Sequence, residues 1–167
     1  MQNVIEIKRL TKNYHTDAGE VAVLKGIDVS IKSGEFVAIM GPSGSGKSTF
    51  MNILGCLDKA TSGEYILNGN DTKSLSKDAL ANLRNRVIGF VFQGFNLLPR
   101  KTLLDNVALP LVYAGWDISK RHIKAKEMLK NVGLEAFGSY LPSHISGRQQ
   151  QRVAIARAPV NDPKLIL

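Results

Sequence analysis

The sequence predicts an α/β domain whose central sheet is mainly parallel. Two continuous apolar runs, at 36–40 and 87–92, have the length of strands that are buried on both faces, and a third begins at 164–167. Segments with helical features lie between these runs, and such alternation is typical of a parallel sheet. The chain has 167 residues, of which 44% are hydrophobic and 22% charged, so disorder, collagen and a coiled-coil rod are excluded.

The first third of the chain predicts half-buried strands, a buried strand and a helix. Apolar residues alternate with charged or polar ones at Ile5 and Ile7 and again at 27–31, which is the period of a half-buried strand. The apolar run at 36–40 follows, and a glycine-rich loop then leads into a helix over 47–57. Residues 65–67, followed by Asn68-Gly69, predict a short strand and a tight turn.

The rest of the chain carries helix caps separated by apolar strands. Four residues are placed to cap helices: Ser76, Thr102, Ser119 and Ser146. Gly133 ends the third of these helices, and Pro159 limits the fourth. The strand at 87–92 exits into Gln93, and 164–167 opens another buried strand.

The net charge limits the classes of binding partner, and the cysteine content indicates the redox state of the cellular compartment. The excess of 22 Lys and Arg over 14 Asp and Glu gives a net charge of +8, which favours nucleotides, nucleic acid or a membrane surface without choosing among them. The single cysteine, Cys56, cannot form an internal disulfide and fits a reducing compartment. We expect a cytosolic domain, because no signal peptide or membrane-spanning run is recognisable.

The glycine-rich segment 41–48 matches the pattern G-x-x-x-x-G-K-[ST] at every fixed position. Glycines allow the backbone to turn its N–H groups toward an oxyanion, and the following helix adds the positive end of its dipole. Lys47 can reach the outer phosphates of a nucleotide, and the Ser48 hydroxyl can ligate Mg²⁺. A buried strand is expected before this loop and a helix after it, so a phosphate site is favoured over a chance match.

Three further segments resemble motifs of the ABC-transporter ATPases. Residues 91–99 resemble the glutamine loop of this family, 146–158 resemble its signature motif and helix, and 161–167 resemble the lead into its Walker B strand. The resemblance runs from about Val4 to Leu167 in the family's order. Residues 41–58 and 96–115 are most similar to the ATPases of the macrolide-export and lipoprotein-release type.

This resemblance implies a fold and a domain organisation. The fold is a P-loop NTPase (RecA-like) core with a mainly parallel sheet, a small antiparallel β subdomain and a helical subdomain. We expect residues 1–167 to form a single ABC-type ATP-binding domain that is incomplete at its C-terminus. Residues 1–93 and 142–167 would form the nucleotide-binding core, and 94–141 the helical subdomain.

The resemblance also implies roles for individual residues. Tyr14 would stack on adenine, and the phosphates of ATP would be bound by Gly41, Pro42, Ser43, Gly44, Ser45, Gly46, Lys47, Ser48 and Thr49. Gln93 would hold Mg²⁺ together with Ser48, position the attacking water and report the nucleotide state to a membrane subunit. A second copy's ATP would meet the signature residues Ser146, Gly147, Arg148 and Gln149. The alternatives are an ordinary loop aromatic for Tyr14, a polar strand end for Gln93 and a simple helix cap for Ser146.

The sequence departs from the family pattern at three points. Arg148 replaces the second glycine of the signature, and we expect it to obstruct the opposing phosphate rather than pair with it. Pro159 stands where the family's helix continues with an apolar residue. The family's metal-binding Asp and catalytic Glu would follow Leu167, so the 167 residues are expected to bind ATP and to be deficient in hydrolysis.

Three functions remain in competition. The first is the ATP-binding subunit of an exporter, which would act as a homodimer with a membrane-spanning partner on the inner face of the cell membrane. The second is a nucleotide-binding module without hydrolysis, or a decayed gene product. The third is a nucleic-acid-associated ATPase of the same family. No recognition helix, RNA-binding motif or zinc-finger spacing supports the third, so no nucleic acid is expected as a partner.

Overall fold

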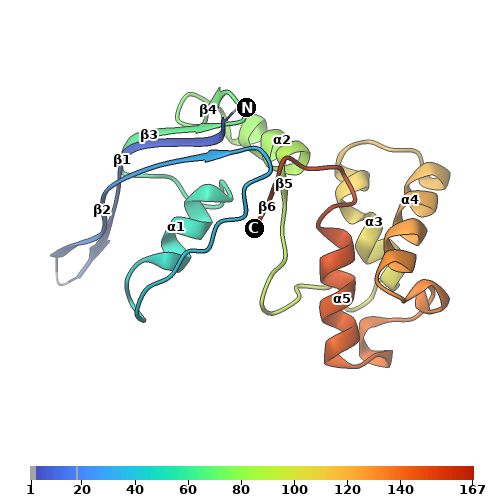
Figure 1. The fold of residues 1–167 in the computed structure, drawn as a ribbon. Coiled ribbons are helices and arrows are strands. Elements are labelled where there is room, and N and C mark those ends of the chain that lie inside the picture. Colours follow the sequence, from blue (N-terminus) through green and yellow to red (C-terminus); the bar gives the residue numbers. More distant parts are fainter. Residues whose placement is uncertain (1–2, 18) are drawn as a thin grey trace. The chain divides into compact units, whose positions relative to one another are not determined.

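A computed structural model describes residues 3–17 and 19–167. The chain forms two compact units, Met1–Ala81 and Asn82–Leu167. The first unit is built on a four-stranded antiparallel sheet with the strand order β2-β1-β3-β4 (Figure 1). Its elements are β1 (Asn3–Thr16), β2 (Gly19–Lys32), α1 (Lys47–Leu54), β3 (Ser62–Leu67), β4 (Asn70–Asp71) and the first turns of α2 (Lys77–Val87).

The strands of the first unit form where period-two alternation predicts them. Ile5 and Ile7 of β1 are buried and pair with Ile31 and Val29 of β2. The short strand at 65–67 is confirmed as the end of β3, and Asn68 and Gly69, at φ 46° and 79°, make the tight turn into β4. These predictions rest on local pattern, and the structure confirms them.

The expected buried strand at 36–40 is wrong. This segment has neither helix nor strand, and Phe36 and Met40 are 99% and 87% exposed. An apolar run becomes a buried strand only where neighbouring strands bond its backbone and helices cover its faces. Among the described residues no strand pairs with 36–40, so the run lacks the partners that its hydrophobicity would need.

The second unit combines three helices with a short parallel pair of strands. Its strands are β5 (Ile88–Gly89) and β6 (Leu165–Ile166), which pair in parallel. Its helices are α3 (Leu103–Tyr113), α4 (Ile118–Asn131) and α5 (Gly147–Arg157), with 3₁₀ turns at Glu135–Phe137 and Pro142–His144. Within the described residues this pair is the only parallel pairing, so the expectation of a mainly parallel sheet is not met. The strand predicted over 87–92 is regular only at Ile88–Gly89.

The helices α3, α4 and α5 pack side by side around one apolar core (Figure 1). The fully buried side chains of this core include Leu103, Val107, Leu111, Leu129, Leu134, Val153 and Val160. The division at residues 94 and 142 that the sequence analysis draws stays a prediction. No helix in the described ranges is long and apolar enough to cross a bilayer.

Most of the predicted helix boundaries are confirmed. The hydroxyl of Thr102 accepts a hydrogen bond from the Asp105 N–H at 3.1 Å, and α5 ends at Arg157, before Pro159. The cap predicted at Ser119 is wrong by two residues. The Asp117 carboxylate caps α4 by accepting the Ser119 N–H at 2.9 Å, so the helix begins one residue before Ser119 and the Ser119 N–H is one of the donors that the cap satisfies.

Candidate functional site

The loop at 41–46 leads into an uncapped helix N-terminus. Gly46 is the N-cap of α1 and offers no side chain, while its carbonyl accepts the Phe50 N–H at 2.8 Å. The N–H groups of the first turn, from Lys47, Ser48 and Thr49, have no carbonyl partner within the helix. With the helix dipole behind them, these donors favour an anion at the loop.

Glycine is required in this loop by conformation and by space. Gly44 and Gly46 have φ of 79° and 90°, a region that side chains disfavour. A Cβ atom on Gly46 would lie 2.9 Å from Leu24 Cδ2 and 3.2 Å from the Val23 carbonyl oxygen. A Cβ atom on Gly41 would lie 2.8 Å from Ser45 Oγ. The glycines therefore give the loop the curvature that the motif predicts.

The ammonium group of Lys47 is held inside the curve of the loop. Its Nζ donates to the carbonyl oxygens of Gly41 at 2.8 Å and Pro42 at 2.7 Å. These bonds place a positive charge next to the free N–H donors, and the exposed Ser48 hydroxyl follows in the first turn of α1. The residues present thus fit a phosphate group. For Mg²⁺ the first turn of α1 offers the Ser48 hydroxyl, and the described residues contain no group of three or more His, Cys, Asp or Glu that could hold a metal.

Tyr14 of β1 is fixed by two partners that sequence reasoning missed. Its hydroxyl donates to Asp58 Oδ2 at 2.8 Å, and Lys12 Nζ lies 4.7 Å from its ring centroid. Lys12 also donates to Asp58 Oδ1 at 2.8 Å. The ring is 38% exposed, so a base that stacks on Tyr14 must take the face that Lys12 leaves free.

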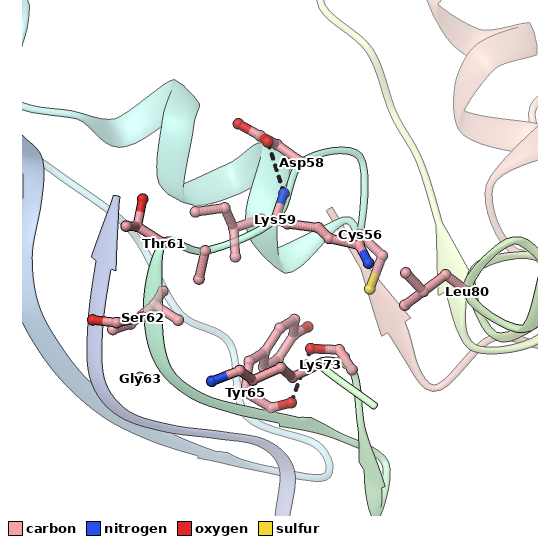
Figure 2. Close-up of a pocket in the computed structure, with 13 residues that line it drawn as sticks. Cys56, Asp58, Lys59, Thr61, Ser62, Gly63, Tyr65, Lys73 and Leu80 are labelled. Carbon is pink, nitrogen blue, oxygen red and sulfur yellow. Dashed lines mark hydrogen bonds between the residues drawn. The ribbon is translucent and has the colours of Figure 1, made fainter. Parts of the chain in front are cut away.

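The Asp58 carboxyl is ionised by this arrangement. Burial raises its pKa, but hydrogen bonds from Lys12, Tyr14 and the Lys59 N–H outweigh burial and hold the pKa below its usual value. The bond from the Lys59 N–H, at 2.7 Å, is one of the dashed lines in Figure 2. This stabilisation is present above the unfolded pKa and is lost as the pH falls through the folded one. Tyr14 is therefore anchored at neutral pH.

A cavity of about 260 Å³ lies in the same unit, and Asp58 and Lys59 are among the residues that line it (Figure 2). Its apolar lining includes Ile53, Tyr65 and Leu80, and the Tyr65 hydroxyl donates to the Leu54 carbonyl at 2.7 Å. None of the residues 41–49 lines this cavity. We therefore assign it no part in phosphate binding.

Gln93 lies in an exposed turn of the second unit, a few residues beyond β5. The turn is closed by bonds from the Phe95 N–H to the Phe92 carbonyl at 3.0 Å and from the Asn96 N–H to the Gly94 carbonyl at 2.7 Å. An exposed amide at a strand exit is able to bind a ligand that reaches it. Its role toward Mg²⁺ and water stays a prediction.

The predicted signature residues form the N-terminus of α5. Ser146 and Gln149 make a reciprocal capping box: Ser146 Oγ accepts the Gln149 N–H at 3.4 Å, and Gln149 Oε1 accepts the Ser146 N–H at 2.8 Å. Gly147 has open space where a Cβ atom would lie, and Arg148 is exposed. Among the residues that the structure describes, no atom lies close enough to require glycine at 147.

Arg157 is a further polar residue that the sequence analysis overlooked. This side chain, at the end of α5, is only 8% exposed and donates to the carbonyl oxygens of Phe95 and Asn96. The sequence feature that could have identified Arg157 is its position as a cation among the alanines of 154–158, on the buried side of the helix. The partners of Arg157 lie 61 and 62 residues away, so no local pattern identifies them.

Comparison with known proteins identifies close relatives over the whole chain. The family described as "ABC transporter" matches residues 24–167. The chain is 52% identical over 165 residues to the macrolide export ATP-binding/permease protein MacB of Mannheimia succiniciproducens, covering 99% of this chain and 26% of that protein. It is 51% identical to the uncharacterized ABC transporter ATP-binding protein YknY of Bacillus subtilis, covering 98% of this chain and 71% of that protein. The chain thus spans about a quarter of the length of MacB.

A solved structure shares the fold. The dimeric structure of MJ0796, a bacterial ABC transporter cassette, superposes with a TM-score of 0.89 at 48% sequence identity, covering 97% of this chain and 72% of that one. A second structure of the same cassette, in a post-hydrolysis state bound to ADP and Pi, gives the same TM-score and identity. The fold of the chain is therefore that of this cassette.

Proposed function

Because the chain belongs to the ABC transporter family, we propose that it is the ATP-binding part of an exporter and binds Mg-ATP at residues 41–49. The observation that carries this proposal is the loop geometry: left-handed glycines, an uncapped first turn of α1 and the Lys47 ammonium beside it. A glycine-rich turn without a function would have no reason to combine these three features. The presence of bound ADP and Pi in the related cassette supports the choice of nucleotide.

Each site residue has a proposed role in binding. Lys47 leaves its carbonyl partners for the outer phosphates, and the N–H groups of Ser48 and Thr49 donate to phosphate oxygens. Tyr14, anchored through Asp58, stacks on the adenine. Ser48 and Gln93 would hold the Mg²⁺ ion, which would neutralise charge on the phosphates when bound. Gln93 also orients the water.

The second ATP contact comes from another copy of the chain. Gly147 is open to solvent at the N-terminus of α5, and no packing against the described part of the chain explains a glycine there. We propose that Ser146, Gly147 and Gln149 approach the γ-phosphate held by a second copy. The dimer in the MJ0796 structures, at 48% identity, supports this arrangement.

The names of the relatives suggest what kind of membrane partner and transported molecule this chain serves. MacB is named as an ATP-binding/permease protein for macrolide export, and this chain spans about a quarter of such a protein. We propose that the chain powers a membrane-spanning permease and lies on the cytoplasmic face of the membrane. We propose no nucleic-acid partner.

Residues 1–167 alone are expected to bind Mg-ATP and to release phosphate slowly. After β5 the chain continues with Phe90, Val91, Phe92 and Gln93, so β5 is not followed by an acidic residue, and the site proposed here assigns no carboxylate of residues 1–167 to the attacking water. Phosphate release by these residues should stay far below about 1 per second, with saturable binding of Mg-ATP. Turnover at that rate, abolished by Lys47→Ala, would contradict this proposal. Absence of saturable binding would contradict the proposed function itself.

Replacing Arg148 by glycine is expected to speed hydrolysis in the full-length protein. The exposed Arg148 side chain follows Gly147, where close approach of phosphate to backbone is proposed. Removing its bulk should raise kcat several-fold, roughly 1 kcal/mol in the barrier. Steady-state ATPase rates of wild type and Arg148→Gly test this, with the exposed Lys120→Gly as a surface control on another helix. If wild type is the faster enzyme, Arg148 clamps the phosphate instead of obstructing it.

A further inference from the structure

The turn that carries Gln93 is bonded to the end of α5 by one buried cation. The guanidinium of Arg157 donates from Nη1 to the Asn96 carbonyl at 2.7 Å and from Nη2 to the Phe95 carbonyl at 2.8 Å. The side chain is 8% exposed, and burial lowers the pKa of the guanidinium. A buried cation is unfavourable unless hydrogen bonds compensate it, and the two carbonyls supply them.

These two carbonyls belong to residues whose backbone conformation is unfavourable. Phe95 and Asn96 have φ of 61° and 47°, so two successive non-glycine residues lie in the left-handed region. Such a conformation is uncommon for a bulky residue such as phenylalanine and persists only where the surroundings hold it. The planar fork of arginine matches two adjacent oxygen atoms in a way that one ammonium group does not.

The far end of the same segment is held from α3. Asn106 is fully buried; its Oδ1 accepts the Leu98 N–H at 2.7 Å, and its Nδ2 donates to the Leu98 carbonyl at 3.1 Å. The same Nδ2 lies 3.1 Å from the Lys101 carbonyl and 2.9 Å from the Thr102 carbonyl. Residues 95–102 are thus held at both ends by buried polar side chains from two helices, while Leu98 stays 40% exposed between them.

We propose that Arg157 is a positioning residue that holds the Gln93 turn in one conformation and ties it to α5. Because α5 begins at the Ser146 cap and ends at Arg157, one rigid helix joins the signature residues to the Gln93 turn. The consequence for catalysis rests on the proposed function, in which Gln93 orients water. The structural part, that Arg157 fixes 95 and 96, does not depend on it.

The test is amide hydrogen exchange and ATPase kinetics in the full-length protein, with Arg157→Gln against Arg152→Gln. Arg152 lies on the same helix, is exposed and donates one hydrogen bond to the Val132 carbonyl at 3.1 Å, so its replacement removes the same charge and an arginine-to-carbonyl bond away from the Gln93 turn. In Arg157→Gln the amides of 94–98 should exchange roughly tenfold faster or more, with α3 and α4 unchanged. The kcat for ATP should fall roughly tenfold, with KM within about a factor of two. Arg152→Gln should change neither.

Four outcomes would overturn the proposal or its catalytic part. Exchange at 94–98 that is no faster than in Arg152→Gln contradicts the clamp, and acceleration spread equally over α3, α4 and α5 indicates a merely structural residue. Faster exchange at 94–98 with unchanged kcat contradicts the catalytic part. If Arg157→Gln does not fold, Arg157→Lys carries the same test: intermediate exchange is expected, and a wild-type rate would contradict the two-carbonyl clamp. If the wild-type protein does not bind ATP, the proposed function is wrong. The exchange result then still tests whether Arg157 fixes residues 95 and 96.

Discussion

Replacing Lys47 by alanine is expected to weaken the binding of Mg-ATP at least about tenfold, which corresponds to about 1.5 kcal/mol or more. The Lys47 ammonium donates to the carbonyl oxygens of Gly41 and Pro42 within the loop and becomes a charge-assisted donor to phosphate when the nucleotide binds. Calorimetric titration with Mg-ATP measures the change.

The matched control for this variant is Lys25→Ala. Lys25 is an exposed lysine on β2, outside the loop, so its replacement removes the same charge without touching the site. Its affinity should equal that of wild type. Equal affinities of wild type and Lys47→Ala for Mg-ATP would contradict binding at the phosphate loop. Equal losses of affinity in Lys47→Ala and Lys25→Ala would mean that only the net charge of the protein affects binding.

Replacing Gly89 by alanine is expected to lower the free energy of unfolding by about 3 kcal/mol. A Cβ atom on Gly89 would lie 2.2 Å from the Ala158 carbonyl oxygen and 2.9 Å from its carbonyl carbon. Both are backbone atoms, so the strand β5 or the end of α5 must shift. Urea unfolding followed through the fluorescence of Trp116, the single tryptophan of this chain, measures the loss.

The control is Gly138→Ala in the same unit. There a Cβ atom would find its nearest neighbours at 3.7 and 3.8 Å, which is ordinary contact, so stability should change by less than about 1 kcal/mol. If the two variants are equally stable, the close approach of β5 to residue 158 does not constrain the fold.

Local signals in the sequence predicted local structure well. The helix cap at Ser146 and the turn at Asn68-Gly69 depend on residues a few positions apart, and both are confirmed. The buried strand at 36–40 depends on partners elsewhere in the chain, which the pattern cannot supply, and it is wrong. The shift of the α4 cap from Ser119 to Asp117 arose because both residue types cap helices equally well.

The same distinction separates the site residues. The loop at 41–48 is contiguous, so motif, conformation and donors could all be derived from the sequence. The anchor of Tyr14 could not, because Lys12 and Asp58 are 46 residues apart and meet only through the pairing of β1 with β3. The bonds from Arg157 to the Gln93 turn join α5 to a segment more than 60 residues earlier, for the same reason.

The most direct test of the central claim follows the backbone amide resonances of Lys47, Ser48 and Thr49 while Mg-ATP is added to the ¹⁵N-labelled protein. These are the free donors at the N-terminus of α1. If the nucleotide binds at residues 41–49, these amides should show large shifts that saturate together with the binding isotherm, and they should not shift when adenosine replaces ATP. Saturable binding of Mg-ATP that leaves these three resonances unchanged would place the nucleotide elsewhere and contradict binding at residues 41–49.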